Sequence, residues 1–155
     1  MGRHRVKAPS EKWDKYFLRI AREVATASKD PSSKVGAIVV RDRRVLSTGY
    51  NGFPRSVADD DRLRDRAMKY DRIVHAEMNA AIYAGRECIG STMYMFGFKG
   101  APCINCAKHL IASGIVRVVS SGQEIPDRWG ASIEESTDLF YEAHVGLAYY
   151  DEGDL

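Results

Sequence analysis

The segments that decide the fold of this chain are His75-Ala76-Glu77 and Pro102-Cys103-Ile104-Asn105-Cys106, because one metal ion needs both. A structural zinc site is closed by four protein ligands, whereas a catalytic zinc keeps one position for water. One imidazole and two thiolates, from His75, Cys103 and Cys106, leave that position available. On a helix, Glu77 points in a different direction from His75, so we predict that it carries protons without binding the metal.

A closed structural zinc site or a redox pair is the alternative interpretation of Cys103-x-x-Cys106. Under that interpretation Cys88, His109 or His144 would supply a fourth ligand. The order His-x-Glu followed by Pro-Cys-x-x-Cys is the signature of zinc nucleobase deaminases, and its several parts would all have to coincide by chance in a structural site. The pattern therefore favours a catalytic zinc.

Composition favours a small substrate over a polymer. The chain has 155 residues, with 23 basic and 21 acidic side chains and a formal charge of +2. This charge is too small to indicate a strongly basic surface that would bind nucleic acid. We expect a flexible N-terminus over residues 1–10, a single domain over 11–155, and neither a signal peptide nor a membrane span. Three cysteines, two of them assigned to metal, predict a reducing compartment, the cytoplasm or a host cytoplasm if the protein is viral.

Hydrophobic periodicity predicts alternating helices and strands. Apolar residues at three-to-four spacing from Trp13 to Val24 predict a first helix that ends near Asp30. The order predicts an α/β fold of three layers, with helices on both faces of a mixed five-stranded sheet. The further predicted elements are strands over 35–40 and 45–50, a charged loop with a helical turn over 59–69, a helix over 75–85, a strand over 92–96, a helix over 103–113, a strand over 116–120, a helix over 132–143 and a strand over 145–150.

Both halves of the zinc motif fall at predicted helix starts. The backbone N–H groups there, and the positive end of the helix, favour thiolates and lower their pKa. Pro102 fits the first turn or the residue before it, where a missing N–H costs nothing. Cys103 and Cys106 lie three residues apart, on one face of one helix.

The sequence resembles the deoxycytidylate deaminases, which convert dCMP to dUMP, from Trp13 to Tyr150. The resemblance implies a cytidine-deaminase-like fold and a zinc-dependent hydrolase that supplies dUMP for thymidylate synthesis. Glu77 would protonate N3 of cytosine and then carry a proton to the leaving amine. Two segments differ in length: 54–75 is shorter than in the vertebrate enzymes, and 96–101 is about three residues longer. The resemblance is carried by Ser28–Ala37, Gly49–Pro54, Lys69-Tyr70 leading into His75–Ala80, and Pro102–Ala107.

The resemblance also implies the substrate contacts. Asn51 would bind the sugar, although the same residue suits a turn. Trp129 would lie near the base and sugar, or pack on the last helix. A lone Lys or Arg is more often a solvated charge, so each phosphate contact stays open. The remaining expected substrate residues are Ala76 and Pro102, with Ser28, Lys29 and Arg128 as the phosphate candidates.

Many members of this family are hexamers that dCTP activates and dTTP inhibits, with Mg²⁺ accompanying the nucleotide. Arg86 suits a triphosphate and Tyr83 suits stacking, although the two could equally form a packing pair on one helix. The expected regulatory residues are Asn51, Gly52, Phe53, Tyr83 and Arg86.

Three other functions share the zinc motif. A nucleic-acid editing deaminase, acting on tRNA adenosine or on cytidine, should have a more basic surface. A free-base or nucleoside deaminase should not need a 5′-phosphate. A non-enzymatic zinc-stabilised binding protein should hold the metal with four ligands and tolerate the loss of Glu77.

Overall fold

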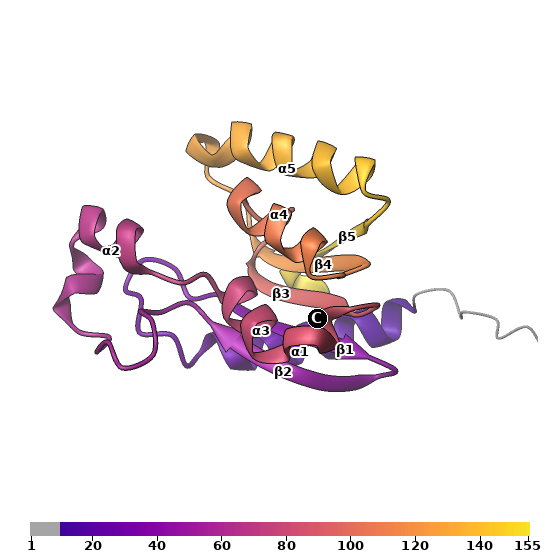
Figure 1. Cartoon of the computed structure of the whole chain (residues 1–155), viewed down its shortest axis with the longest axis horizontal. Coiled ribbons are helices and arrows are strands. Elements are labelled where there is room, and N and C mark those ends of the chain that lie inside the picture. The colour runs from indigo at the N-terminus through magenta and orange to yellow at the C-terminus, as the bar shows by residue number, and fades with distance from the viewer. Residues whose placement is uncertain (1–9) are drawn as a thin grey trace, which may run out of the picture.

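The computed structural model describes residues 10–155, so the predicted flexible N-terminus lies outside the described residues except for Ser10. Helices and strands alternate in the predicted order (Figure 1). The elements are α1 (Glu11–Ala25), β1 (Gly36–Arg41), β2 (Arg44–Tyr50), α2 (Arg66–Arg72), α3 (Ala76–Ala84), β3 (Thr92–Phe98), α4 (Ile104–Ala112), β4 (Arg117–Gln123), α5 (Gly130–Glu142) and β5 (Gly146–Asp151), with short 3₁₀ helices η1 (Asp61–Arg64), η2 (Gly85–Cys88), η3 (Asp127–Trp129) and η4 (Glu152–Asp154).

The five strands form one mixed sheet in the order β2-β1-β3-β4-β5. Strand β1 is antiparallel to both β2 and β3, whereas β3, β4 and β5 run parallel. Asp42 and Arg43, both with positive φ, form the two-residue turn between β1 and β2, a backbone that matches the twist of the paired strands. The predicted hairpin and mixed sheet are confirmed.

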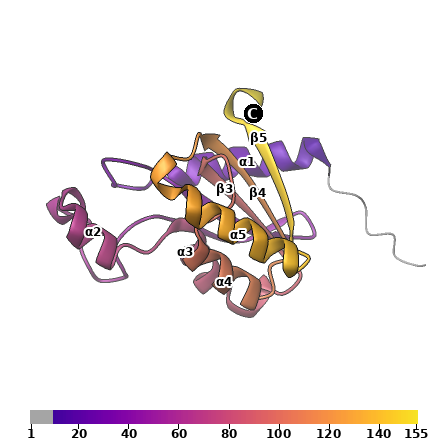
Figure 2. The same cartoon turned by 90° about the horizontal axis from the view of Figure 1, so that it is seen from above.

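Alternate residues of each strand face opposite sides of the sheet, and each side has its own core. Ile38 and Tyr94 pack with Phe17 of α1 on one side. Ala37, Met95 and their neighbours pack with α3, α4 and α5 on the other side. Figure 2 shows α1 behind the strands and α3, α4 and α5 in front of them. The predicted three-layer arrangement is therefore confirmed.

Helix α3 lies unusually close to the sheet because β2 carries Gly49. A Cβ atom at Gly49 would lie 2.7 Å from the carbonyl oxygen of Ala76 and closer still to the amide nitrogen of Ala80. Any other residue would push the start of α3 away from the sheet. Since His75 and Glu77 stand at that start, Gly49 fixes the depth of one half of the zinc motif.

Helix α1 ends at Ala25, earlier than predicted. The amides of Thr26, Ala27 and Ser28 bond to carbonyl groups three residues back, which tightens the last turn. The Ser28 hydroxyl then donates to the backbone oxygen of Asn51 (2.9 Å), which draws the chain out of the helix and toward β2.

The charged segment after β2 is more regular than the loop with one helical turn that we predicted. It contains η1 and α2, whose first turns are capped by Asp60 and Asp65 through bonds to backbone amides. In Figure 1 and Figure 2, α2 projects from one end of the molecule.

Strand β3 extends further toward Pro102 than the strand predicted over 92–96. Strand β3 continues to Phe98, which pairs with Gln123 of β4. Gly100 then donates to the Ser120 hydroxyl (2.9 Å), which donates in turn to the Gly100 carbonyl (2.8 Å). This pair of bonds fixes the approach to the cysteines.

Within residues 10–155, no helix has both the length and the apolar character needed to cross a membrane.

Candidate active site

His75, Cys103 and Cys106 converge at the first turns of α3 and α4. His75 immediately precedes α3, Cys103 immediately precedes α4, and Cys106 lies in the first turn of α4, as predicted. The Nδ1 atom of His75 lies 3.2 Å from Sγ of Cys106 and 3.6 Å from Sγ of Cys103. Tetrahedral zinc with its usual bond lengths requires about 3.6 Å between a nitrogen and a sulfur ligand. The three ligand atoms therefore fit a zinc ion.

No fourth ligand joins this cluster among the residues that the structure describes. The Cys88 thiol is buried and donates to the carbonyl of Ala81, and the His109 ring is 2.7 Å from the carbonyl oxygen of Asn105. His144 lies in the turn between α5 and β5 with positive φ. Within residues 10–155, the cluster therefore offers three protein ligands, the number that catalytic zinc sites use.

Without metal, the proton distribution already favours a thiolate at Cys103. The hydrogen bond from Cys106 and the neighbouring His75 lower the pKa of Cys103 to about 4, against the effect of burial. Donating to Cys103 raises the pKa of Cys106, and burial adds to this. The bond to Cys103 raises the pKa of His75 to about 9, although burial opposes it. The lowered pKa of Cys103 supplies a thiolate, the form of cysteine that binds zinc.

Glu77 is the second residue of α3 and is only 4% exposed. Burial raises the pKa of its carboxyl group, and the nearby His75 opposes part of that rise. Its carboxylate is not within ligand distance of all members of the cluster. A carboxyl group whose pKa is raised toward neutrality is suited to both give and accept a proton.

His75, Cys103 and the buried Glu77 line a cavity of about 380 Å³. This volume is within the range of small-molecule sites. Apolar side chains form the walls, and exposed arginines line the opening. The residues that line the cavity include Asp30, Val35, Asn51, Arg64, Arg66, Lys69, Tyr70, His75, Ala76, Glu77, Met95, Phe98, Pro102, Cys103, Arg128 and Trp129.

Most of the predicted substrate residues line this cavity, but Ser28 and Lys29 do not. Ala76, Pro102, Arg128 and Trp129 are part of the lining, together with Asn51. Ser28 is buried behind Asn51, and Lys29 is exposed on the surface. The structure therefore places Ser28 as a support for Asn51 and brings other cations, Arg64, Arg66 and Lys69, to the cavity.

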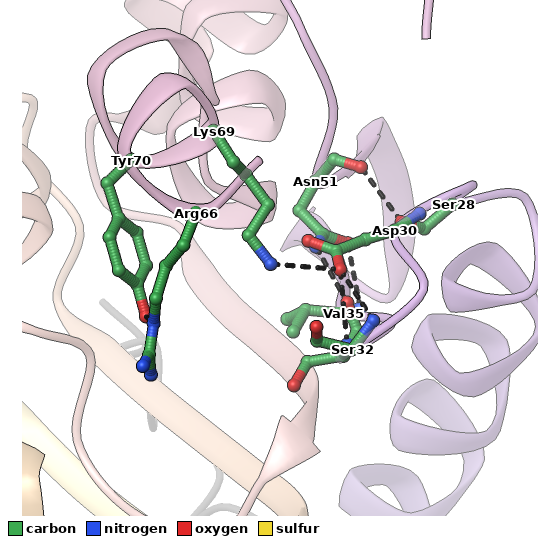
Figure 3. Close-up of polar contacts among 9 residues, drawn as sticks. Ser28, Asp30, Ser32, Val35, Asn51, Arg66, Lys69 and Tyr70 are labelled. Carbon is green, nitrogen blue, oxygen red and sulfur yellow. Dashed lines mark hydrogen bonds and ion pairs between the residues drawn. The ribbon is translucent and has the colours of Figure 1, made fainter. Parts of the chain in front are cut away.

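Asn51 braces the turn after β2 as well as lining the cavity (Figure 3). Its Oδ1 accepts from the amide of Val35 (2.9 Å), and its Nδ2 donates to the carbonyl of Ser33 (2.8 Å) and to Asp30 (3.3 Å). Both amide hydrogens are thereby used within the protein. Only the remaining lone pair of Oδ1 is left for a ligand.

Sequence reasoning missed the serines of α5 that support the cysteine loop. The amide of Ile104 donates to the Ser132 hydroxyl (3.1 Å), and the Ser136 hydroxyl donates to the carbonyl of Pro102 (2.6 Å). Serines four residues apart on one helix face were a possible signal, but their partners are about 30 residues away in sequence. It also missed Asp30, Arg66 and the burial of Lys69, although Lys69-Tyr70 stood among the matched segments.

The expected regulatory residues other than Asn51 lie outside the cavity lining. Tyr83 is 57% exposed, and its hydroxyl accepts from Arg55 of the loop after β2 (2.8 Å). Gly52 and Phe53 are buried, and Arg86 is exposed in η2.

The comparisons with known proteins agree on one protein family. Residues 11–121 match the model of the cytidine and deoxycytidylate deaminase zinc-binding region. The uncharacterized deaminase in the luxG 3′ region of Aliivibrio fischeri is 38% identical over 140 residues, which cover 89% of this chain and 93% of that protein. The deoxycytidylate deaminase of Mycobacterium phage D29 is 43% identical over 121 residues, which cover 69% of this chain and 92% of that protein.

A solved structure shares the fold. The crystal structure of dCMP deaminase from the cyanophage S-TIM5 in apo form has a TM-score of 0.69, at 21% identity, and covers 90% of this chain and 98% of that chain.

Proposed function

Because this chain belongs to the cytidine and deoxycytidylate deaminase family and is a hydrolytic deaminase, we propose that it converts dCMP and water to dUMP and ammonia. The main support is that a cluster of three possible zinc ligands and the buried carboxyl group of Glu77 occur together at one cavity, which is large enough for a nucleotide. The relative from phage D29 is a deoxycytidylate deaminase and is 43% identical to this chain, which supports dCMP as the substrate.

His75, Cys103 and Cys106 would hold the zinc ion. Zinc held there would supply the Lewis acidity that makes water a nucleophile near neutral pH. Glu77 takes a proton from the attacking water and gives it to N3 of the ring as the C4–O bond forms, and it later carries the remaining proton of that oxygen to the C4 amino group. The C4–N bond then breaks, and the nitrogen leaves as ammonia while C4 becomes the carbonyl of dUMP.

The cavity supports a small substrate over a nucleic acid. Asn51 and Trp129 line it and would contact the sugar of dCMP, and the exposed Arg128, which also lines it, would contact the phosphate. Ala76 and Pro102, the sequence neighbours of His75 and Cys103, also line it and would contact the base. We further propose that the product dUMP serves thymidylate synthesis in the cytoplasm.

An assay of ammonia release tests this function directly. We expect turnover of dCMP to exceed that of CMP, dCTP and deoxycytidine, with no deamination of tRNA or single-stranded DNA. Preferential deamination of tRNA or single-stranded DNA would instead support an editing deaminase. A preference for deoxycytidine over dCMP would identify a nucleoside deaminase.

We also propose regulation by dCTP and dTTP, with Mg²⁺ accompanying the triphosphate, in a hexamer. Its support is the contact between Arg55 and Tyr83, which joins the α3 surface to the loop whose other end, Asn51, lines the cavity. Arg86→Glu should remove the response to both triphosphates and preserve basal turnover. Wild-type kinetics that do not change with dCTP or dTTP would contradict this proposal.

A further inference from the structure

Two of the three exposed arginines that line the cavity have no acidic partner among the described residues, unlike Arg64, whose Nε lies 3.9 Å from Asp61. Arg66 and Arg128 line the opening and are exposed, and within residues 10–155 neither forms an ion pair. Of the acids that line the cavity, Asp30 is paired with Lys69 (3.3 Å), and Glu77 is buried at the zinc end. Two guanidinium groups therefore remain for an anionic group of the ligand.

Aromatic side chains bring these two arginines to the same opening. The Nε of Arg66 donates to the Tyr70 hydroxyl (3.2 Å), and its guanidinium lies 5.6 Å from the centre of the Tyr70 ring. The Tyr70 ring meets Trp129 edge to face at 6.3 Å, and Arg128 lies 5.9 Å from the centre of the Trp129 ring. Arginines from α2 and η3 thus flank one aromatic contact.

The local electrostatic field agrees with this geometry. The hydrogen bond from Arg66 lowers the pKa of Tyr70, and the positive charges of Arg66, Arg128 and Lys69 add to that effect against slight burial. A field that stabilises a phenolate would also stabilise a phosphate.

A buried ion pair holds α2 in the position that presents Arg66 (Figure 3). The side chains of Lys69 and Asp30 are 11% and 4% exposed, and Asp30 also accepts from the amide of Ser32 (2.8 Å). Lys69 and Arg66 are three residues apart, so fixing one fixes the turn that carries the other.

We infer that Arg66, seated on Tyr70, is a specificity residue that binds the 5′-phosphate of the nucleotide opposite Arg128. The inference rests on the proposed function and deepens it, because it assigns the part of the substrate that distinguishes dCMP from deoxycytidine. With the reacting base near Glu77 and the phosphate at the arginines, the apolar walls face the base and sugar. Arginine suits this task because its planar fork donates two hydrogen bonds to one phosphate.

Steady-state kinetics on Arg66→Gln, with Arg72→Gln as the matched control, test this role. Arg72 is also on α2 and exposed, but it does not line the cavity. Arg66→Gln should lower kcat/KM for dCMP by about 10- to 100-fold, mainly through KM, and should leave kcat/KM for deoxycytidine unchanged. Arg66→Lys should recover part of the loss, and Arg72→Gln should match wild type. An equal loss for both substrates, or no loss for dCMP, would overturn the assignment.

Phosphate binding separates this inference from the proposed function. Inorganic phosphate should raise the Tm of zinc-loaded wild type and of Arg72→Gln at constant ionic strength, and should raise that of Arg66→Gln by much less. Equal stabilisation of Arg66→Gln and wild type would reject Arg66 as the anion ligand. If wild type shows the Arg66-dependent shift but deaminates no cytosine compound, the anion site stands and the dCMP proposal fails.

Discussion

Glu77 combines a charged side chain with a nearly complete lack of water contact. Burial raises the pKa of this carboxyl group, so its protonated form persists closer to neutral pH than that of an exposed glutamate. In the proposed reaction it must give up a proton and take one back within a single turnover. The same burial means that a replacement must keep its shape.

Glu77→Gln should keep zinc bound and lower kcat by about 10²- to 10⁴-fold, the usual contribution of a positioned acid–base group. The amide preserves the side-chain volume but cannot exchange the proton. Metal analysis and ammonia release on the same preparation measure the two effects. Zinc loss in a folded Glu77→Gln protein would show that Glu77 is a ligand.

Cys106→Ala should release zinc and also lower stability, because zinc held by the cluster would join the starts of α3 and α4. Cys88→Ala is the matched control, since Cys88 is also buried but lies outside the cluster. Zinc content and Tm before and after chelation would be compared. Wild type and Cys88→Ala should lose stability on chelation, whereas Cys106→Ala should not respond. Stoichiometric zinc in Cys106→Ala would refute the ligand set.

The zinc ligands and the residues at the cavity opening differ in how far sequence alone could identify them. The spacing of His75, Cys103 and Cys106 is rare, and all three lie at helix starts. Two short segments of sequence are therefore enough to identify them as candidate metal ligands. Arg66 has no such mark, because an arginine on a short charged helix looks like any solvated residue. Its neighbours across the opening, Arg128 and Trp129, come from 62 and 63 residues further along the chain, and only the fold brings them together.

At the scale of elements, strongly periodic segments were predictable and short charged ones were not. The strands and α1 could be predicted because each segment has apolar residues at the spacing that places them on one buried face. Helix α2 has seven residues and almost no apolar face, so its position depends on tertiary contacts. The end of α1 likewise depends on a tertiary contact, the hydrogen bond from the Ser28 hydroxyl to the backbone oxygen of Asn51.

Lys69→Met should destabilise the protein by about 3–5 kcal/mol, because it leaves Asp30 as an uncompensated buried charge. The double variant Asp30→Asn with Lys69→Met should lose less than the sum of the single variants. Lys15→Met is the control, since the Lys15–Glu11 pair is on the surface of α1 and should contribute less than about 1 kcal/mol. Urea unfolding measures these free energies.

Hydrogen exchange of the α2 amides shows whether the ion pair acts locally. If Lys69 holds α2 in place, amide exchange over 66–72 should accelerate in Lys69→Met more than exchange in the central strands. Uniform acceleration throughout the protein would instead indicate a global effect on stability.

At the scale of the whole molecule, Asp14 connects the first helix to three strands on the face opposite the zinc site. Its carboxylate accepts two hydrogen bonds from Arg117 (2.7 Å each), one from Tyr94 (2.9 Å) and one from Tyr150 (2.8 Å). Asp14 is 1% exposed, and its partners come from β3, β4 and β5. Sequence alone could not reveal this junction, because the partners of Asp14 lie 80, 103 and 136 residues away.

The charge of Asp14 should make stability depend on pH in the acid range. Burial alone would raise the pKa of Asp14, but its bonds with Arg117, Tyr150 and Tyr94 outweigh burial and lower it. The unfolded chain then binds the proton more readily than the folded protein. The stabilisation is therefore complete above the unfolded pKa, about 3.9, and is lost as pH falls through the lower folded value.

Asp14→Asn should lower the free energy of unfolding by about 3–5 kcal/mol at pH 7, because Arg117 becomes a partly buried charge without its partner. The difference from wild type should stay constant down to about pH 5 and shrink below about pH 4, where the wild-type carboxylate also loses its advantage. Urea unfolding from pH 7 to pH 3 measures this dependence, with the exposed Asp138→Asn as a control expected to change stability by less than about 0.5 kcal/mol. A difference between Asp14→Asn and wild type that is the same at pH 3 and pH 7 would show that the Asp14 charge is not what joins α1 to the sheet.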